Sequence, residues 1–287
     1  MATIKAIETV AQMQAWSAAE RGAGRRVGCV PTMGYLHEGH LSLIRECRRR
    51  ADKVVMTLFV NPTQFAPHED FNRYPRDFEG DCQKAESAGA EVVFAPSVAE
   101  MYPEGYQTFV TVEGVSQGME GEVRPTHFRG VATVVTKLFT AVKPQVAVFG
   151  EKDYQQLKVI ERMVRDLNLG IEIVGLATVR EPDGLAMSSR NVYLSPEERE
   201  RALSISRALF AARAAVDNGE REIPALIKAA VKTIAAAGLV LDYLEIRDAE
   251  TLSPLERLDR PARILIAARV GKTRLIDNLA LAADGNK

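Results

Sequence analysis

Short apolar runs alternate with helix-like segments over the first two thirds of the chain, and no other feature restricts the fold as strongly. The runs cover residues 27–30, 54–60, 91–94, 146–149 and 171–179. Runs of this length, rich in β-branched residues, are typical of strands buried on both faces. Strands that alternate with helices pair in parallel, so we expect an α/β fold built on a doubly wound parallel sheet.

The segments between these runs predict the other elements of this region. Helices are expected at residues 12–20, 40 onward, 77–88, 131–142 and 153–167. Asp153 is expected to cap the last of them. Residues 107–112 alternate apolar and polar side chains, which predicts a strand. Residues 66–76 predict a long loop over the ligand side of the sheet, and the glycine-rich stretch 114–124 is expected to be mobile.

The pattern changes after Arg180. Ser195 followed by Pro196 is a strong helix start, because Pro is favoured at the first helical position. Helices are expected at residues 196–217 and 223–237, and strands at 241–246, 263–270 and 273–279, the last two joined by a hairpin turn at 271–272. This order predicts a smaller α+β C-terminal domain. We place the two domains at residues 1–182 and 183–287.

A histidine pair lies in the turn that follows the first apolar run. Pro31 and Gly34 are expected to end that strand, and a helix begins near His40. The C-terminal ends of parallel strands open onto a crevice, and helix N-termini offer N–H groups to anions. In His37-Glu38-Gly39-His40 the two imidazoles share a face if the turn is helical, and Gly39 leaves room for a phosphate. The alternative is two surface histidines in a Gly-containing loop.

Charge and cysteine usage restrict the partners and the compartment. Lys and Arg are scattered over a chain of formal net charge −1, so no basic surface for nucleic acid is expected. The three cysteines lack the spacing of a zinc site and fit a reducing cytosol, which predicts a cytoplasmic protein. Residues 1–11 lack the apolar core of a signal peptide, and no stretch approaches the roughly 20 apolar residues of a membrane helix.

Four segments are expected to meet at the C-terminal edge of the parallel sheet. They are residues 37–40, 61–64, 150–156 and 187–190. Arg190 is suited to bidentate contact with phosphate, and Lys152 supplies a compact positive charge. The amides of Gln64 and Gln156 suit the hydroxyl and carboxylate groups of a small polar substrate. Each segment also has an ordinary interpretation, as an exposed ion pair at a helix start or a hydrophilic loop.

The strings PTMGYLHEGH, FVNPTQF, FGEKDYQQL and MSSRNVYL, in this order and spacing, resemble the pantoate–β-alanine ligases (pantothenate synthetases) of the HxGH nucleotidyltransferase superfamily. The resemblance covers residues 27–194, with a C-terminal part of matching size. It implies a Rossmann-like N-terminal domain, a C-terminal lid domain, a homodimer and magnesium-dependent use of ATP. The cofactor expected is Mg²⁺, with ATP, pantoate and β-alanine as substrates in coenzyme A (vitamin B5) biosynthesis.

The resemblance also implies roles for particular residues. The catalytic set is His37, His40, Lys152 and Arg190. The ATP-binding set is Met33, Gly34, Tyr35, Leu36, His37, Glu38, Gly39, His40, Gly150, Glu151, Lys152, Asp153, Val179, Met187, Ser188, Ser189 and Arg190. Pantoate and β-alanine would contact Gln64, Gln156, Asn61 and Tyr74. Asp81 has two interpretations, as solvated helix surface or as a magnesium ligand.

The implied reaction has two steps. The carboxylate of pantoate attacks the α-phosphorus of ATP, giving pantoyl adenylate and pyrophosphate. The amine of β-alanine then attacks the acyl carbon, giving pantothenate and AMP. Such an adenylate is hydrolysable, so a closing lid is expected, formed by residues 66–74 and the C-terminal domain. The alternatives are a nucleotidyltransferase that makes a dinucleotide, an aminoacyl-tRNA synthetase fragment and a non-catalytic nucleotide sensor.

Overall fold

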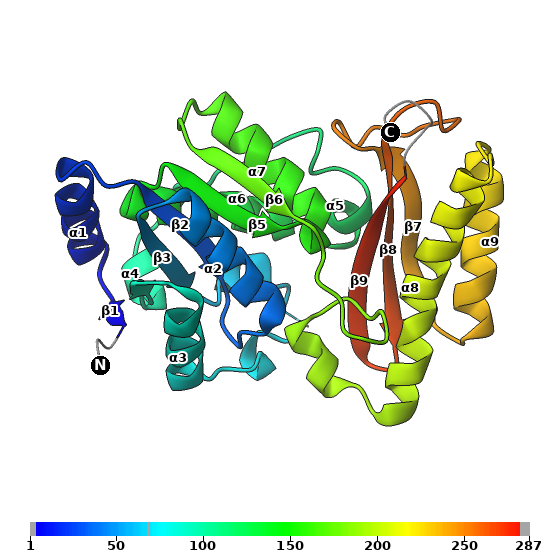
Figure 1. Cartoon of the computed structure of the whole chain (residues 1–287), viewed down its shortest axis with the longest axis horizontal. Helices are drawn as coiled ribbons and strands as arrows, with labels where there is room; N and C mark the ends of the chain where they lie inside the picture. Colours follow the sequence, from blue (N-terminus) through cyan, green and yellow to red (C-terminus); the bar gives the residue numbers. More distant parts are fainter. Residues whose placement is uncertain (1–3, 68, 282–287) are drawn as a thin grey trace.

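The computed structural model describes residues 4–67 and 69–281 and contains two sheets, each with its own helices (Figure 1). The strands of the larger sheet are β1 (Lys5–Ile7), β2 (Val27–Thr32), β3 (Lys53–Leu58), β4 (Val92–Phe94), β5 (Val146–Gly150) and β6 (Glu172–Leu176). Its strand order is β1-β4-β3-β2-β5-β6, and every pairing is parallel.

Helices cover both faces of this sheet. They are α1 (Val10–Gly22), α2 (Glu38–Arg50), α3 (Phe78–Ala88), α4 (Val98–Met101), α5 (Met119–Val123), α6 (His127–Val142) and α7 (Tyr154–Asp166). Cys29 and Val55 belong to an apolar cluster shared with α1, α6 and α7. Their neighbours Val30 and Met56 belong to a second cluster shared with α2 and α3. Alternate strand residues therefore enter opposite layers, which confirms the doubly wound α/β sheet.

The two central strands separate toward their C-terminal ends. β2 pairs with β3 from Val27 to Thr32, but with β5 only at Gly28 and Cys29. β3 and β4 lie on one side of β2, and β5 and β6 on the other, so the strand order reverses here. A reversal of this kind is where open α/β sheets bind ligands. Pro31 was expected to end the strand, but β2 continues through it, because pairing with β5 has already stopped there.

The C-terminal region packs two helices on an antiparallel sheet. Its elements are α8 (Pro196–Asp217), α9 (Ile223–Ala236), β7 (Val240–Asp248), β8 (Ala262–Val270) and β9 (Thr273–Leu281). Ser195 and Glu198 form a reciprocal capping box that starts α8. Gly271, with φ +58°, lies in the two-residue turn between β8 and β9. The predicted smaller α+β unit and its hairpin are confirmed.

Two expectations for the region before α6 are wrong. Residues 107–112 form no strand, because the Val110 N–H donates to the Thr133 hydroxyl on α6 (2.9 Å) instead of to a neighbouring strand. The stretch 114–124 contains α5 and is fixed by Gln155, whose side-chain amide donates to the carbonyls of Val115 and Gln117 at 3.1 Å. This stretch therefore packs around a buried side-chain amide.

The structure also differs from the expectations at one helix cap and in several short elements. Asp153 stands at the N-cap position of α7, but its side chain makes no capping hydrogen bond. The sequence patterns gave no indication of β1 or α4, which have only three and four residues. In the loop 66–76, Phe71–Arg73 form the 3₁₀ turn η2. Among the described residues, the longest helices are too polar or too short to cross a bilayer.

Candidate active site

A cavity of about 210 Å³ lies at the C-terminal edge of the large sheet, where β2 and β5 separate. The four predicted segments all contribute to it. Its polar lining includes His37, Gly39, His40, Gln64, Tyr74, Lys152, Asp153, Gln156, Ser188, Ser189 and Arg190. Met33, Gly150, Val179 and Met187 complete the predicted residues in the wall. Segments far apart in sequence therefore surround one small space.

Part of the lining of this cavity is apolar. α6 contributes Val131, Val134, Val135 and Leu138, and two aromatic residues, Phe59 and Phe149, stand beside them. The polar groups named above line the same space. A ligand seated here would therefore need an aliphatic part and a polar or charged part.

The two predicted histidines are neighbours, with ring centroids 4.1 Å apart. Burial, together with the charge of Lys152, lowers the pKa of His37 to about 4. Burial and the neighbouring His37 lower the pKa of His40 to about 3. Both imidazoles are therefore neutral near pH 7. A Cβ on Gly39 would lie 2.9 Å from the His37 ring, so Gly39 also makes room for that ring.

The hydrogen bond between the two residues fixes a tautomer. The backbone N–H of His37 donates to Nδ1 of His40, with 3.3 Å between the nitrogens. Because Nδ1 accepts, the proton of the neutral His40 ring is on Nε2. His40 can therefore offer an N–H to a ligand in the cavity.

Gln64 is fixed from behind by three residues that do not line this cavity, and one of them, Asn61, was predicted to contact the substrates. The amide nitrogen of Asn61 donates to Gln64 Oε1 and to the Gly130 carbonyl, both at 3.1 Å. Asn61 is 1% exposed and lies behind Gln64 rather than in the cavity wall. The backbone carbonyl of Gln64 accepts from Arg124 and from His127 Nδ1, again at 3.1 Å each. Sequence patterns gave no indication of Arg124 or His127, because their partners are distant in the chain.

The turn η3 (Glu151–Asp153) presents Lys152 to the cavity, and the second sheet holds its backbone. Asn278 on β9 donates its amide N–H groups to the carbonyls of Glu151 and Lys152, each at 2.8 Å. The Glu151 carboxylate is paired with Arg263 on β8. Glu151 therefore faces the C-terminal region, not the cavity.

Arg190 lies in η4 (Ser189–Tyr193) and is paired with the loop over the site. Its guanidinium donates to both carboxylate oxygens of Asp70 at 2.9 Å, and lies 5.8 Å from the Tyr74 ring centre. The hydroxyl of Ser189 donates to the Tyr35 carbonyl at 3.3 Å. The Met-Ser-Ser-Arg segment thus connects the histidine turn with the loop 66–76.

Some residues of the predicted ATP-binding set lie outside the cavity. Gly34, Tyr35 and Leu36 form the turn behind it, Leu36 packs in the core, and Glu38 is exposed and paired with Arg45. Asp81 is 1% exposed, so the expectation of a solvated helix residue is wrong. Its oxygens accept the N–H groups of Tyr35 and Leu36. No group of three or more His, Cys, Asp or Glu suited to a metal occurs in the described part of the chain.

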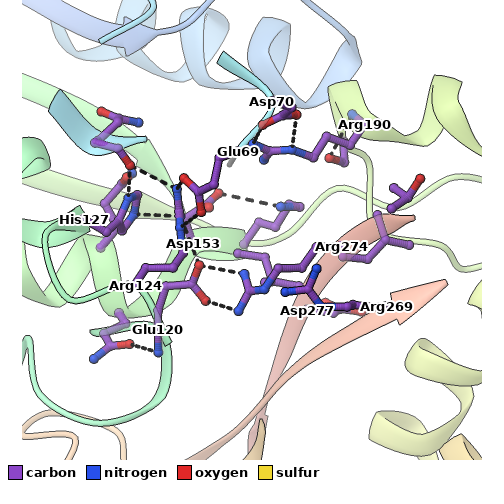
Figure 2. A pocket seen from close by; sticks show the side chains of 18 of the residues that line it. Glu69, Asp70, Glu120, Arg124, His127, Asp153, Arg190, Arg269, Arg274 and Asp277 are labelled. Carbon is purple, nitrogen blue, oxygen red and sulfur yellow. Dashed lines mark hydrogen bonds and ion pairs between the residues drawn. The ribbon is translucent and has the colours of Figure 1, made fainter. Parts of the chain in front are cut away.

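A second cavity, of about 710 Å³, adjoins the first and lies between the two sheets. Gln64, Lys152, Gln156, Ser188 and Arg190 line both cavities. Figure 2 shows an ion-pair network across the larger one, in which Arg274 from β9 reaches Glu120 at 2.7 and 2.8 Å.

The network continues to the loop over the site. Arg124 lies between Glu120 and Glu69, and donates to Glu69 Oε1 at 2.6 Å (Figure 2). Burial alone would raise the pKa of Glu120, but the contacts with Arg274 and the charge of Arg124 bring it to about 2. Glu120 is therefore an anion over the physiological range, and it connects the two sheets electrostatically.

Comparisons with known proteins give one consistent result. The family model described as pantoate-beta-alanine ligase matches residues 5–280. The pantothenate synthetase of Myxococcus xanthus is 60% identical over 283 residues, covering 98% of this chain and 97% of that protein. That of Geobacter sulfurreducens is 53% identical over 279 residues, covering 97% and 99%.

Solved structures similar to this chain are of the same kind of protein. Pantothenate synthetase from Thermus thermophilus superposes with a TM-score of 0.91 at 51% identity, covering 96% of this chain and 99% of that one. Pantoate-beta-alanine ligase from Francisella tularensis, complexed with beta-gamma ATP and beta-alanine, has a TM-score of 0.79 at 32% identity, covering 96% and 97%.

Proposed function

This chain belongs to the pantoate–β-alanine ligase family, and on that premise we propose how its residues divide the reaction. The reaction condenses pantoate with β-alanine with the use of ATP, through pantoyl adenylate, and releases AMP and pyrophosphate. We propose the smaller cavity as the place of both steps. The observation that carries this proposal is the meeting of the histidine pair, two glutamines, Lys152 and the Ser-Ser-Arg segment around one space.

Adenylation needs alignment and charge neutralisation more than a base, because the pantoate carboxylate is already a nucleophile. His40, with its proton on Nε2, donates a hydrogen bond to a phosphate oxygen of ATP. Lys152 brings a positive charge to the same oxygens. His37 is neutral in the free protein, and the approach of a triphosphate raises the pKa of both imidazoles.

The walls of the smaller cavity match the parts of pantoate. Pantoate carries two methyl groups on one carbon, and the wall of α6 side chains and Phe149 is apolar. Gln64 and Gln156, in the polar lining, hold the hydroxyl and carboxylate groups. Tyr74 adds to this lining from the loop 66–76. Asn61 acts on pantoate only through Gln64, whose amide it fixes.

The proposed ATP-binding site lies between the histidine turn and the Met-Ser-Ser-Arg segment. Gly39, Val179 and Met187 give the nucleotide a partly apolar wall, and the Met187 N–H is already bonded to the Val179 carbonyl at 3.0 Å. Ser188 and Ser189 offer hydroxyl groups toward the phosphates. The guanidinium of Arg190 donates to the phosphates once its hydrogen bonds to Asp70 are broken.

The second step needs β-alanine to reach the acyl carbon after pyrophosphate has left. The larger cavity gives that route, because it adjoins the smaller one and Gln64 is among the residues that line both. The amine attacks the acyl carbon of pantoyl adenylate, the acyl–phosphate bond breaks, and AMP leaves. We propose the loop 66–74 and the C-terminal unit, residues 183–287, as the lid that keeps water from the adenylate.

Mg²⁺ is proposed as a companion of the ATP phosphates, since Asp81 does not fit as its ligand. A homodimer is proposed, supported by the 40% exposed ring of Phe109 beside Tyr106. A cytoplasmic location is proposed, supported by the three free thiols.

Exchange of labelled pyrophosphate into ATP tests the site. Wild-type protein is expected to catalyse exchange only when pantoate is present, and His40→Ala to lower the rate by roughly two to four orders of magnitude. Near-normal exchange in that variant would remove His40 from the first step. Product analysis separates the alternatives, because a stable dinucleotide indicates a nucleotidyltransferase, and ATP binding without pyrophosphate release indicates a sensor.

A further inference from the structure

The carboxylate of Asp81 accepts two hydrogen bonds from the backbone of the turn that precedes the histidine pair. Its Oδ2 accepts the N–H of Tyr35 and its Oδ1 accepts the N–H of Leu36, both at 2.7 Å. Asp81 lies in the first turn of α3 and is 1% exposed. From the same helix, Lys84 donates to the Leu36 carbonyl at 3.1 Å. Side chains of α3 therefore bind three backbone groups of this turn: two N–H donors and one carbonyl acceptor.

The turn at residues 34–36 has an uncommon backbone conformation. Gly34 has φ +85° and Tyr35 has φ +52°, and a left-handed conformation is uncommon for a residue with a Cβ. A Cβ on Gly34 would lie 2.9 Å from Asp81 Oδ2, so the carboxylate and the turn are in close contact. The hydroxyl of Ser189 contacts the Tyr35 carbonyl from the other side. The direction in which the chain enters His37 is thus set by this turn.

We propose that Asp81 is a positioning residue for His37 and His40, acting through the backbone of Tyr35 and Leu36, and that it is not a ligand of Mg²⁺. Both of its oxygens are already used by N–H donors at short distances. Each oxygen keeps a second lone pair, but the side chain is 1% exposed, so a metal could reach it only by displacing the groups packed around it. Among the residues described, Asp81 belongs to no group of three or more His, Cys, Asp or Glu side chains that could hold a metal ion.

The substitution Asp81→Asn tests this role with little change in shape. The amide keeps one acceptor oxygen but turns an N–H₂ group toward the other backbone N–H, so one of the two contacts is lost. Because the turn positions groups that act in the transition state, kcat of pantoate-dependent pyrophosphate exchange is expected to fall roughly 10- to 100-fold. KM for ATP is expected to change less than kcat. Glu79→Gln, an exposed charge removal in the same first helical turn, is the matched control.

Two measurements separate positioning from metal binding. In the wild type and in Asp81→Asn, the Mg²⁺ concentration that gives half-maximal exchange is expected to agree within about twofold. In metal-free wild-type protein, the Tyr35 and Leu36 amides are expected to exchange slowly with solvent and to keep their NMR shifts when Mg²⁺ is added without ATP. Both amides are expected to lose protection in Asp81→Asn but not in Glu79→Gln.

Several outcomes would overturn the proposal. A rise of tenfold or more in the half-maximal Mg²⁺ concentration, with rescue at high Mg²⁺, would make Asp81 a metal ligand. Loss of thermal stability in Asp81→Asn with unchanged kcat well below the melting temperature would make it merely structural. This inference rests on the proposed role of the histidines, and His40→Ala tests that role separately. If Asp81→Asn does not fold, the amide measurements on wild-type protein still decide.

Discussion

The side-chain amide of Asn278 donates a hydrogen bond to the backbone carbonyl of Lys152, with 2.8 Å between nitrogen and oxygen. The same amide also donates to the Glu151 carbonyl at 2.8 Å. Asn278 is 3% exposed and belongs to β9, whereas Lys152 lines the cavity at the end of β5. The C-terminal sheet therefore fixes the turn that presents a cation to the proposed phosphate site.

We predict that Asn278→Asp lowers kcat/KM for ATP roughly 10- to 100-fold. The carboxylate is close in size to the amide but has no donors, and it would face two carbonyl oxygens, so the turn at Lys152 has to move. Steady-state kinetics with varied ATP measure the effect. Asn218→Asp at the C-cap of α8, far from this turn in the chain, is the control. Equal kinetics in both variants would show that this contact does not position Lys152.

The guanidinium of Arg190 is paired with Asp70, so the proposed contact with ATP requires Arg190 to exchange one anion for another. We predict that Asp70→Asn binds ATP several-fold more tightly than wild type in the absence of pantoate, since no carboxylate then competes for the guanidinium. Isothermal titration calorimetry measures this. Weaker binding in Asp70→Asn would mean that the Asp70 pair supports the ATP-binding form of Arg190. Arg190→Ala is expected to weaken ATP binding and also to slow turnover.

Gly130 allows α6 to approach the turn η1 (Pro62–Gln64). A Cβ at this position would lie 2.5 Å from the Thr63 carbonyl oxygen and 2.7 Å from the Gln64 nitrogen, both of them backbone atoms. We predict that Gly130→Ala lowers the free energy of unfolding by about 1–3 kcal/mol and raises KM for pantoate, because Gln64 is displaced. Gly22→Ala in α1 is the control, because nothing lies within 4 Å of its added Cβ. Unchanged KM for pantoate in a folded Gly130→Ala protein would contradict the assignment of Gln64.

Stability is predicted to fall as the pH drops through the range where unfolded histidines become protonated. Burial, with the charge of Arg124, lowers the pKa of His127 from 6.5 to about 4. Between these values the unfolded chain binds more protons than the folded one, so the free energy of unfolding decreases with decreasing pH. From about pH 7 to about pH 5 the loss attributable to His127 is at most ~2 kcal/mol.

Urea unfolding of wild type and His127→Gln at the two pH values tests this. The variant keeps a donor for the Gln64 carbonyl and an acceptor for Arg124, so it is expected to fold. Its stability is expected to depend less on pH than that of the wild type. Identical pH dependence would show that His127 is not buried in its neutral form. His37 and His40, whose pKa values are also lowered, contribute the dependence that remains.

Local patterns predicted the order of the elements and the edge of the sheet where the site lies. The apolar runs became β2 to β6, and the Ser195–Pro196 signal became a capped helix. They also predicted that the His37–His40 segment and the Ser188–Arg190 segment would meet, because parallel strands place their C-terminal ends on one edge. Such patterns are read within about ten residues, over which the period of a helix or strand is visible.

The same patterns failed where a polar side chain takes a distant partner. Asp81 had the features of a solvated helix residue or a metal ligand, yet its oxygens bind backbone N–H groups more than forty residues away. The glycine-rich stretch 114–124 was expected to be mobile, yet Gln155 fixes its backbone. Neither contact leaves a periodic signal in the sequence.

The sequence alone thus determined the sheet, the histidine turn and the chemistry that the loop residues offer. Only the tertiary structure decided which polar groups fix that chemistry in place: Asp81 behind His37, and Asn278 behind Lys152. The physical reason is that secondary structure follows from interactions between near neighbours. The partner of a buried polar group depends instead on how the folded chain brings remote segments together.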